Sequence, residues 1–137
     1  MRKNIVLDTN TYVSGYIFTN SITAKALEKA QENYQLVFSE QTWAELTDVI
    51  NRPKFDKYLD SSARFNILEL LKEVAIFVEP TETITDCRDP KDNKFLEIAV
   101  AADAQYIVTG DLDLLILNPF RTIFILKSGD FLALELA

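Results

Sequence analysis

The stretch DPKDNKFLEIAVAADAQYIVTGDLDLL, residues 89–115, combines an amphipathic helical pattern with a short apolar run typical of a buried strand. Acidic residues lie at both ends of this unit. Asp89 and Asp92 open the helix, and Asp111 and Asp113 follow the strand. Open parallel α/β sheets carry their ligand sites at the carboxyl ends of the strands. If the unit belongs to such a sheet, we expect Asp92 and Asp111 to converge at that rim in an acidic pocket.

The rest of the chain repeats the alternation of apolar strands and amphipathic helices, without a Gly/Ser linker or an internal repeat. Residues 12–20 indicate a helical turn followed by a loop, and Ser39 and Ser128 are candidate helix N-caps. The predicted strands are 5–7, 36–38, 76–78, 106–109 and 121–126, and the predicted helices are 21–33, 40–51, 61–75, 89–102 and 128–136. This order predicts one α/β domain over residues 1–137, a three-layer sandwich whose mostly parallel central sheet has about five strands.

Composition sets the cellular context. The 137 residues are 48% hydrophobic, which suffices for one core, and every apolar run is far shorter than the roughly 18 residues of a membrane-spanning helix. The first residues lack the pattern of a signal peptide because Asp8 follows so soon. A single cysteine, Cys87, excludes an intrachain disulfide and fits a reducing compartment. We therefore expect a soluble, cytoplasmic protein without membrane contact.

The absence of histidine narrows the possible chemistry. It removes Ser-His-Asp and Cys-His catalysis and every imidazole metal site, so a bound metal would have oxygen ligands, as Mg²⁺ and Mn²⁺ prefer. The net charge of −7 argues against non-specific nucleic-acid binding through a broad basic face. It leaves a nucleic-acid substrate possible, because cations held in an acidic pocket reverse the local charge. The alternative is an acidic protein without such a pocket.

Two acids outside the opening stretch are predicted to reach the same rim. Asp8 directly follows the first strand, although a turn or an N-cap would explain it equally well. Asn10 either caps the next helix or orients a metal-bound water. In helix 40–51, Glu45 lies next to Val49 at the margin of the apolar stripe, so it is the acid of that helix that can face the rim.

The acids of the opening stretch differ in how well a structural role explains them. Asp89 before Pro90 is explained as an N-cap. Asp92 lies in the middle of the apolar stripe of its helix, where a carboxylate needs a lysine, an arginine, a backbone donor or a cation as partner. Asp111 is the counterpart of Asp8 on a second strand, although a Gly-Asp turn is a common structural alternative.

Two neighbours of Asp111 have secondary roles. Thr109 offers a hydroxyl to the pocket, and Asp113 either adds a ligand or caps the turn that starts at Leu112. The residues together thus direct four acids toward one rim: Asp8, Glu45, Asp92 and Asp111. Such a cluster repels itself unless cations neutralise it or some acids stay protonated. Metal-assisted phosphoryl chemistry is the simplest use of this arrangement.

These residues resemble a PIN-domain ribonuclease, in the branch that includes toxins of bacterial and archaeal toxin–antitoxin pairs. The resemblance covers essentially the whole chain. Its motifs are VLDTN at 6–10, Glu45, DPKDNKFL at 89–96 and IVTGDLD at 107–113.

The resemblance implies an endoribonuclease that uses Mg²⁺ or Mn²⁺ to hydrolyse RNA phosphodiesters through a metal-activated water, leaving a 5′-phosphate. It implies a homodimer held inactive by an antitoxin protein. The catalytic residues would be Asp8, Glu45, Asp92 and Asp111, the metal ligands Asp8, Asp92, Asp111 and Asp113, and the supporting polar groups Asn10 and Thr109. Whether Asp89 or Asp92, and Asp111 or Asp113, contacts the metal stays open.

Two other function classes compete with a nuclease. One is a non-catalytic binding module in which the acids are caps and solvated charges. The other is a phosphatase with Asp8 as nucleophile, because Asp8-Thr9-Asn10 superficially resembles the start of the haloacid-dehalogenase pattern. That pattern requires a second aspartate where this chain has Asn10, so the phosphatase ranks below the other two.

Overall fold

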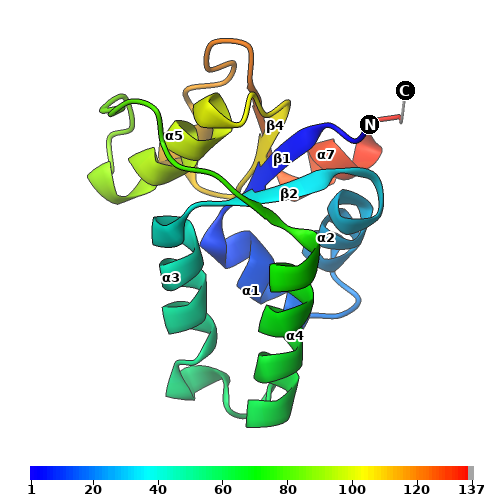
Figure 1. Ribbon diagram of the computed structural model, residues 1–137. Helices are drawn as coiled ribbons and strands as arrows, with labels where there is room; N and C mark the ends of the chain where they lie inside the picture. Colours follow the sequence, from blue (N-terminus) through cyan, green and yellow to red (C-terminus); the bar gives the residue numbers. More distant parts are fainter. Residues whose placement is uncertain (136–137) are drawn as a thin grey trace.

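The five apolar runs form one sheet in the computed structural model, which describes residues 1–135 (Figure 1). All neighbouring strands are parallel, in the order β3-β2-β1-β4-β5, so the predicted fold class is confirmed. The strands are β1 Asn4–Leu7, β2 Gln35–Phe38, β3 Ile76–Phe77, β4 Tyr106–Val108 and β5 Phe124–Leu126. Leu7 pairs with Val108, so the central strands β1 and β4 end side by side at one rim.

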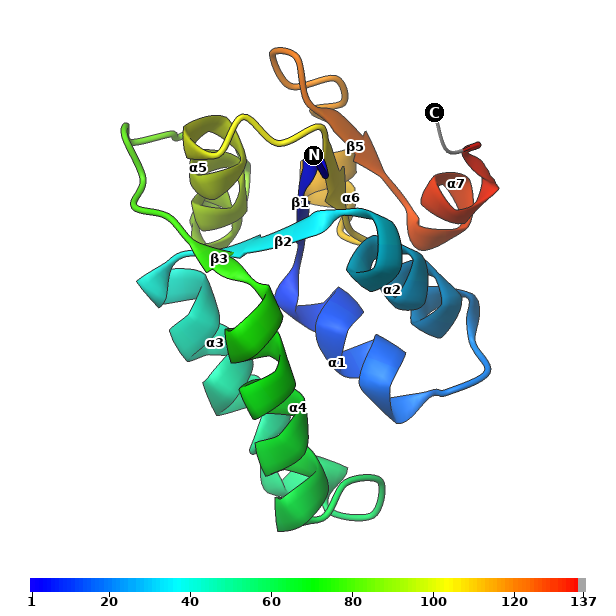
Figure 2. The same cartoon turned by 45° about the vertical axis from the view of Figure 1, so that its right-hand side comes forward.

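Helices cover both faces of this sheet. The helices are α1 Thr9–Ile17, α2 Ile22–Asn33, α3 Glu40–Ile50, α4 Ser61–Val74, α5 Asn93–Ala101, α6 Leu112–Leu115 and α7 Ser128–Ala133, with 3₁₀ turns η1 Pro53–Phe55 and η2 Pro90–Asp92. Alternate strand residues point to opposite faces, so Ile5 and Leu7 pack with α1, α2, α3 and α7, whereas Val6 packs with α5 and α6. Figure 2 shows α5 and the α1–α2 pair on opposite sides of the strands.

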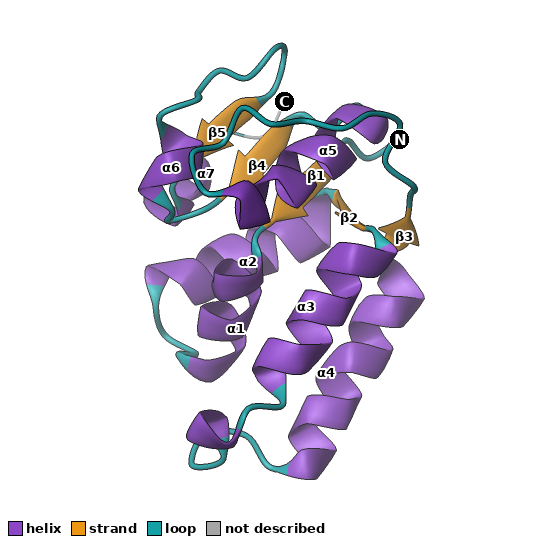
Figure 3. Cartoon of the chain, turned by 90° about the vertical axis from the view of Figure 1, so that its left-hand side faces the viewer, coloured by secondary structure: helices purple, strands orange, loops and turns teal. Residues whose placement is uncertain are grey.

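Helices α3 and α4 form a hairpin that extends beyond the sheet (Figure 3). A buried arginine holds its far end. Arg64 donates hydrogen bonds to the carbonyl oxygens of Ile50 (2.8 Å) and Arg52 (3.1 Å) and forms an ion pair with Asp56 (2.9 Å). These contacts satisfy carbonyl groups at the end of α3 and fix its direction. No helix in residues 1–135 is long and apolar enough to cross a membrane.

The first helix was wrongly predicted as a turn and a loop. Helix α1 continues through Gly15, which faces α2. A Cβ built there would lie 2.7 Å from Leu27 Cδ2, so the missing side chain lets the two helices pack closely. Asp8, not Asn10, is the N-cap, and its side chain accepts from the Thr11 backbone N–H. Buried threonines in α1 weaken the apolar periodicity from which a helix is predicted.

Three further boundaries differ from the prediction. The last strand begins only at Phe124, because the backbone at Arg121 takes a positive φ of 54°. Lys127 precedes α7, so Ser128 is its first residue and not its cap. That helix ends at Ala133, and the predicted end at residue 136 lies outside the described residues.

Apolar side chains at two helix ends are exposed. Ile22, the first residue of α2, and Val74, the last residue of α4, keep much of their surface in solvent. Exposed apolar side chains also occur at five positions on and beside α4, which we call together the α4 surface: Phe65, Leu70, Val74, Ile76 and Phe77. The apolar face of α4 is covered along most of its length, because Leu71 is fully buried and Ile67 and Leu68 pack against the same core.

Candidate active site

A pocket of about 320 Å³ opens where β1 and β4 end, between α3 and the start of α5. Four carboxylates predicted from sequence to meet at this rim line it together, and two cationic side chains stand at its wall. The lining residues are Asp8, Thr9, Asn10, Glu45, Val49, Arg52, Asp89, Lys91, Asp92, Phe95 and Asp111. The convergence predicted for Asp92 and Asp111 is therefore observed.

Asp8 is buried and its carboxylate accepts three hydrogen bonds. Its Oδ1 accepts hydrogen bonds from the Thr11 backbone N–H (2.9 Å) and the Thr11 hydroxyl (2.6 Å), and its Oδ2 accepts from the Thr109 hydroxyl. Burial raises the pKa of Asp8, the hydrogen bonds from Thr109 and Thr11 lower it, and the Asp111 charge adds to the rise. Asp8 is therefore both the N-cap of α1 and a carboxylate of the pocket, so the two readings of this residue hold together.

Asp92 is the least satisfied acid of the pocket. Its Oδ2 atom is buried and has no hydrogen-bond partner among residues 1–135. Burial first, then the nearby Asp111 carboxylate and the Asp89 charge, raise the pKa of Asp92 from its ordinary 3.8 to about 7, against the opposing charge of Lys94. A buried carboxylate oxygen without a donor is costly. This atom therefore marks a place where a cation or a proton stabilises the fold.

Asp111 caps α6 and is oriented by its neighbours. Its Oδ1 accepts from the Asp113 backbone N–H (2.8 Å), and its own N–H donates to the Thr109 hydroxyl (2.9 Å). Thr109 thus connects Asp8 to the turn that carries Asp111. The Asp113 carboxylate lies 3.3 Å from Arg88 Nε and does not line the pocket.

Glu45 reaches the pocket from α3, as its position on the helix margin predicts, and both its oxygens are engaged. Its Oε1 accepts from the Thr9 hydroxyl, and its Oε2 lies 2.6 Å from Lys94 Nζ. Lys94 is a buried lysine at the start of α5, so this ion pair joins α3 to α5 across the pocket wall. It was not predicted from the sequence, because Lys94 falls on the polar side of the predicted helix.

The remaining predicted residues have simpler places. Asp89 caps η2 by accepting from the Lys91 backbone N–H (3.1 Å), which confirms its capping role, and it also lines the pocket. Asn10 lines the pocket from the first turn of α1 and is exposed. Two cations of the wall, Arg52 and Lys91, were not predicted either, because their surroundings depend on how α3 and η2 meet.

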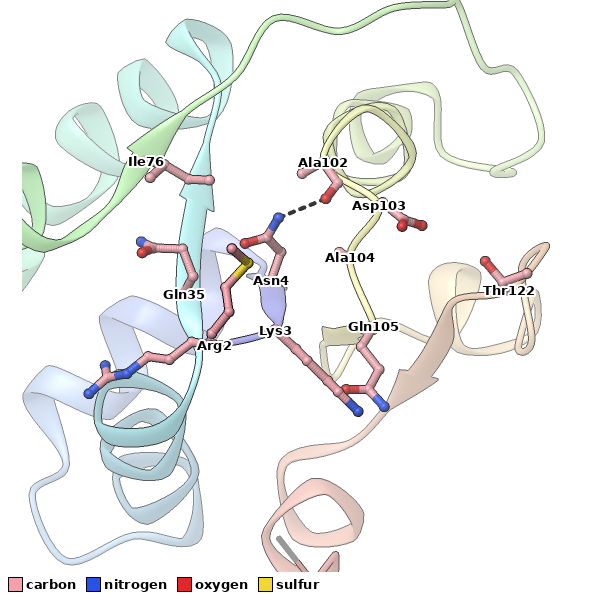
Figure 4. A pocket seen from close by; sticks show the side chains of 11 residues that line it. Arg2, Lys3, Asn4, Gln35, Ile76, Ala102, Asp103, Ala104, Gln105 and Thr122 are labelled. Carbon is pink, nitrogen blue, oxygen red and sulfur yellow. Dashed lines mark hydrogen bonds between the residues drawn. The ribbon is translucent and has the colours of Figure 1, made fainter. Parts of the chain in front are cut away.

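A larger hollow of about 690 Å³ lies at the opposite end of the sheet, where the strands begin (Figure 4). There the Asn4 side chain donates to the Ala102 carbonyl oxygen (2.7 Å). Among residues 1–135, Asp103 is the one carboxylate that lines it, and it takes a positive φ of 50° just after α5. Since α/β sheets bind ligands at the carboxyl ends of strands, the smaller acidic pocket is the better candidate site despite its size.

The acidic pocket suits a hard divalent cation by its chemistry. Its free groups are carboxylate oxygens, one of them the buried and unpartnered Asp92 Oδ2. Within residues 1–135 no three acidic or sulfur side chains form a ready-made ligand group. Asp8, Asp92 and Asp111 are the acids of this pocket that would hold such an ion, with water completing its coordination shell.

A parallel sheet with an acidic pocket at its carboxyl-end rim defines the class of the molecule: an α/β protein with an oxygen-rich site where such sheets bind ligands. The sequence matches the model of the PIN domain over residues 4–113. The chain therefore belongs to the PIN domain family, whose members are generally nucleases, which supports hydrolase activity.

Similar proteins are found by sequence and by structure. The uncharacterized protein MJ1680 of Methanocaldococcus jannaschii is 34% identical over 116 residues, which are 83% of this chain and 74% of that protein. VapBC2 from Rickettsia felis, solved bound to a DNA fragment from its promoter, has a TM-score of 0.57 at 14% identity, covering 90% of this chain and 98% of the other. PAE2754 from Pyrobaculum aerophilum has a TM-score of 0.58 at 13% identity, covering 96% and 87%. The two structures support the fold.

Proposed function

We propose that this protein is a metal-dependent endoribonuclease that hydrolyses RNA phosphodiesters at the acidic pocket with Mg²⁺ or Mn²⁺. The observation that carries the proposal is Asp92 Oδ2, a buried carboxylate oxygen without a partner beside Asp111. An acid in this position costs stability unless a cation occupies the pocket, so its presence is best explained by a cation that the chemistry needs.

The residues of the pocket have distinct tasks in this proposal. Thr11 and Thr109 hold the Asp8 carboxylate in one orientation, and Thr109 also fixes the turn before Asp111. Asp8, Asp92 and Asp111 would hold the divalent ion, which would lower the pKa of a water molecule and neutralise charge on the phosphodiester. Arg52 and Lys91 place positive charge at the pocket wall, where the flanking phosphates of an RNA strand would lie.

Asp113, predicted as an extra metal ligand, is assigned a supporting place here. Its backbone N–H orients Asp111, and its carboxylate holds Arg88 close to the site. Asn10, exposed in the first turn of α1, is positioned to contact a water or the substrate at the pocket mouth.

The phosphatase alternative finds less support. The haloacid-dehalogenase pattern requires a second aspartate two residues after the nucleophile, and Asn10 stands at that position. The binding-module alternative keeps the acids as caps. It explains Asp89, but it gives no reason for the unpartnered Asp92.

RNA cleavage by the purified protein tests the proposal. We expect cleavage that is abolished by a chelator, restored by Mn²⁺, and lost in Asp8→Asn and Asp92→Asn. Asp103→Asn is the matched control because Asp103 lies at the opposite end of the sheet and asparagine tolerates its positive φ. Cleavage that persists without metal in both site variants would overturn the proposal.

We further propose that the protein acts in the cytoplasm as the toxin of a toxin–antitoxin pair, as a homodimer restrained by an antitoxin. The likeness to VapBC2 supports this, and the exposed α4 surface offers apolar area to a protein partner.

Expression of the wild-type chain should arrest growth, whereas expression of Asp8→Asn should not. Light scattering of the purified protein tests the dimer: a monomer at all concentrations would contradict it.

A further inference from the structure

Lys94 is a buried cation inside an acidic site. Its side chain is only 6% exposed, and its Nζ lies 2.6 Å from Glu45 Oε2, donates to the Lys91 carbonyl oxygen, and stands 5.0 Å from the centre of the Phe95 ring. An ammonium has three donors and no acceptor, so a buried one requires partners of this kind. Lys94 is thus fixed in place at the wall of the pocket.

This ion pair divides the acids of the pocket into two groups. Glu45 has both oxygens engaged, one by the Thr9 hydroxyl and the other by Lys94. Asp92 has a buried oxygen without a partner, and the negative charge of Asp111 stands close to it. The charge of Glu45 on α3 is therefore neutralised, whereas the charges of Asp92 and Asp111 are not.

We propose that the Lys94 ammonium takes the place of a second divalent cation, so that the pocket is a one-ion site with the ion on the Asp8, Asp92 and Asp111 side. Lys94 is then a positioning residue that orients and neutralises Glu45. This inference rests on the proposed function, because it assumes that a divalent ion binds here. The physical reason is that a fixed ammonium beside Glu45 repels a divalent ion and already neutralises the charge of that carboxylate, whereas the partners of Asp8 are uncharged hydroxyl and N–H groups.

The alternative is that the ion pair only joins α3 to α5 and has no effect on metal binding. The number of Mn²⁺ ions bound per chain distinguishes these two hypotheses. Metal-free protein is titrated with Mn²⁺, and bound ion is measured by electron paramagnetic resonance and calorimetry. We expect one ion per chain for the wild type and two for Lys94→Met, which keeps the apolar stem and frees Glu45. Lys94→Arg should bind one ion, because its charge persists.

Lys91→Met is the matched control. Lys91 also lines the pocket and loses the same charge, but it is exposed and forms no ion pair with Glu45 within residues 1–135. It should still bind one ion. A second ion in Lys91→Met as well would assign the effect to net charge and overturn the proposal.

The double variant Glu45→Gln with Lys94→Met guards against misfolding. It removes both charges and leaves no buried ion unpaired, so it should fold and bind one ion, since the freed carboxylate is gone. Two ions in the wild type, or one in a folded Lys94→Met, would overturn the inference. The proposed function would still stand if RNA cleavage were sensitive to a chelator. No ion in the wild type overturns both.

Discussion

At the scale of single residues, the acidic pocket depends on hydroxyl groups as much as on acids. Thr109 is fully buried, donates to Asp8 and accepts from the Asp111 N–H, so one hydroxyl links the ends of β1 and β4. Such a link makes the position of each carboxylate depend on the other. The two following predictions test how strongly the site weighs on the stability of the fold.

Thr109→Val should lower the free energy of unfolding by about 1–3 kcal/mol at neutral pH, because it leaves Asp8 short of a donor and the Asp111 N–H short of an acceptor. Urea denaturation measures the difference. Thr109→Ser, which keeps the hydroxyl, is the control and should lose much less. Equal stability of the valine and serine variants would show that the hydroxyl is not what holds Asp8.

Asp92→Asn should stabilise the metal-free protein, and the gain should grow with pH. The pKa of Asp92 is raised to about 7 in the folded state, so between pH 4 and 7 the folded chain holds a proton that the unfolded chain releases. The contribution of Asp92 is therefore most favourable below pH 4 and is lost as pH rises through 7. The full shift corresponds to about 4 kcal/mol, which solvent screening at this half-buried site reduces to about 1–2 kcal/mol.

Denaturation of wild type and Asp92→Asn with a chelator, at pH values from 5 to 8, measures this effect. The variant that loses RNA cleavage should thus be the more stable one at pH 8, which separates loss of activity from loss of fold. A gain that is constant with pH would contradict the assignment of the raised pKa to Asp92.

At the scale of elements, α1, which begins after the N-cap Asp8, packs closely on α2. The contact is closest at Gly15, where an added Cβ would lie 2.7 Å from Leu27 Cδ2 and 3.2 Å from its Cβ. Leu27 is buried and has little room to move. The packing of α1 on α2 therefore needs a residue without a side chain at position 15.

Gly15→Ala should destabilise the protein by about 1 kcal/mol, because overpacking at Leu27 outweighs the better helix propensity of alanine. Gly129→Ala in α7 is the control, since its added Cβ would meet only Ile22 Cγ2 at an ordinary 3.9 Å. We expect the control to be neutral or slightly stabilised. Thermal melts compare the two, and a Gly15→Ala variant as stable as the control would refute the packing argument.

At the scale of the whole molecule, the pocket exists only in the folded chain. Its acids come from four separate places: the end of β1, the middle of α3, the turn η2 and the turn after β4. The unfolded chain holds these carboxylates far apart. Binding of an ion by the proposed site must therefore stabilise the whole fold.

Mn²⁺ at about one hundred times its dissociation constant should raise the stability of the wild type by about 2.7 kcal/mol. Asp92→Asn should show a much smaller rise in melting temperature, and Asp103→Asn should behave as the wild type because its carboxylate lies at the other end of the sheet. Differential scanning calorimetry with and without Mn²⁺ makes the comparison. An equal rise in all three proteins would place the ion elsewhere.

The features of this protein that can be predicted from sequence are those that local residue patterns specify. Short apolar runs predicted every strand, and their order predicted a parallel sheet with Asp8 and Asp111 at its carboxyl-end rim. Helix α1 escaped prediction because Thr9, Thr11 and Gly15 interrupt its apolar period, although each is buried for a reason of packing or hydrogen bonding. Local patterns record which face is apolar, and they do not record what packs against it.

By itself, the sequence determined the fold class, the rim and the four acids that line it, because strand ends and helix faces follow from the spacing of residues along the chain. Only the tertiary structure decided how those acids are satisfied. It paired Glu45 with Lys94, left Asp92 Oδ2 without a partner, and placed Asp113 beside Arg88. The physical reason is that charge neutralisation depends on distances across the packed layers, and these distances are absent from any local pattern.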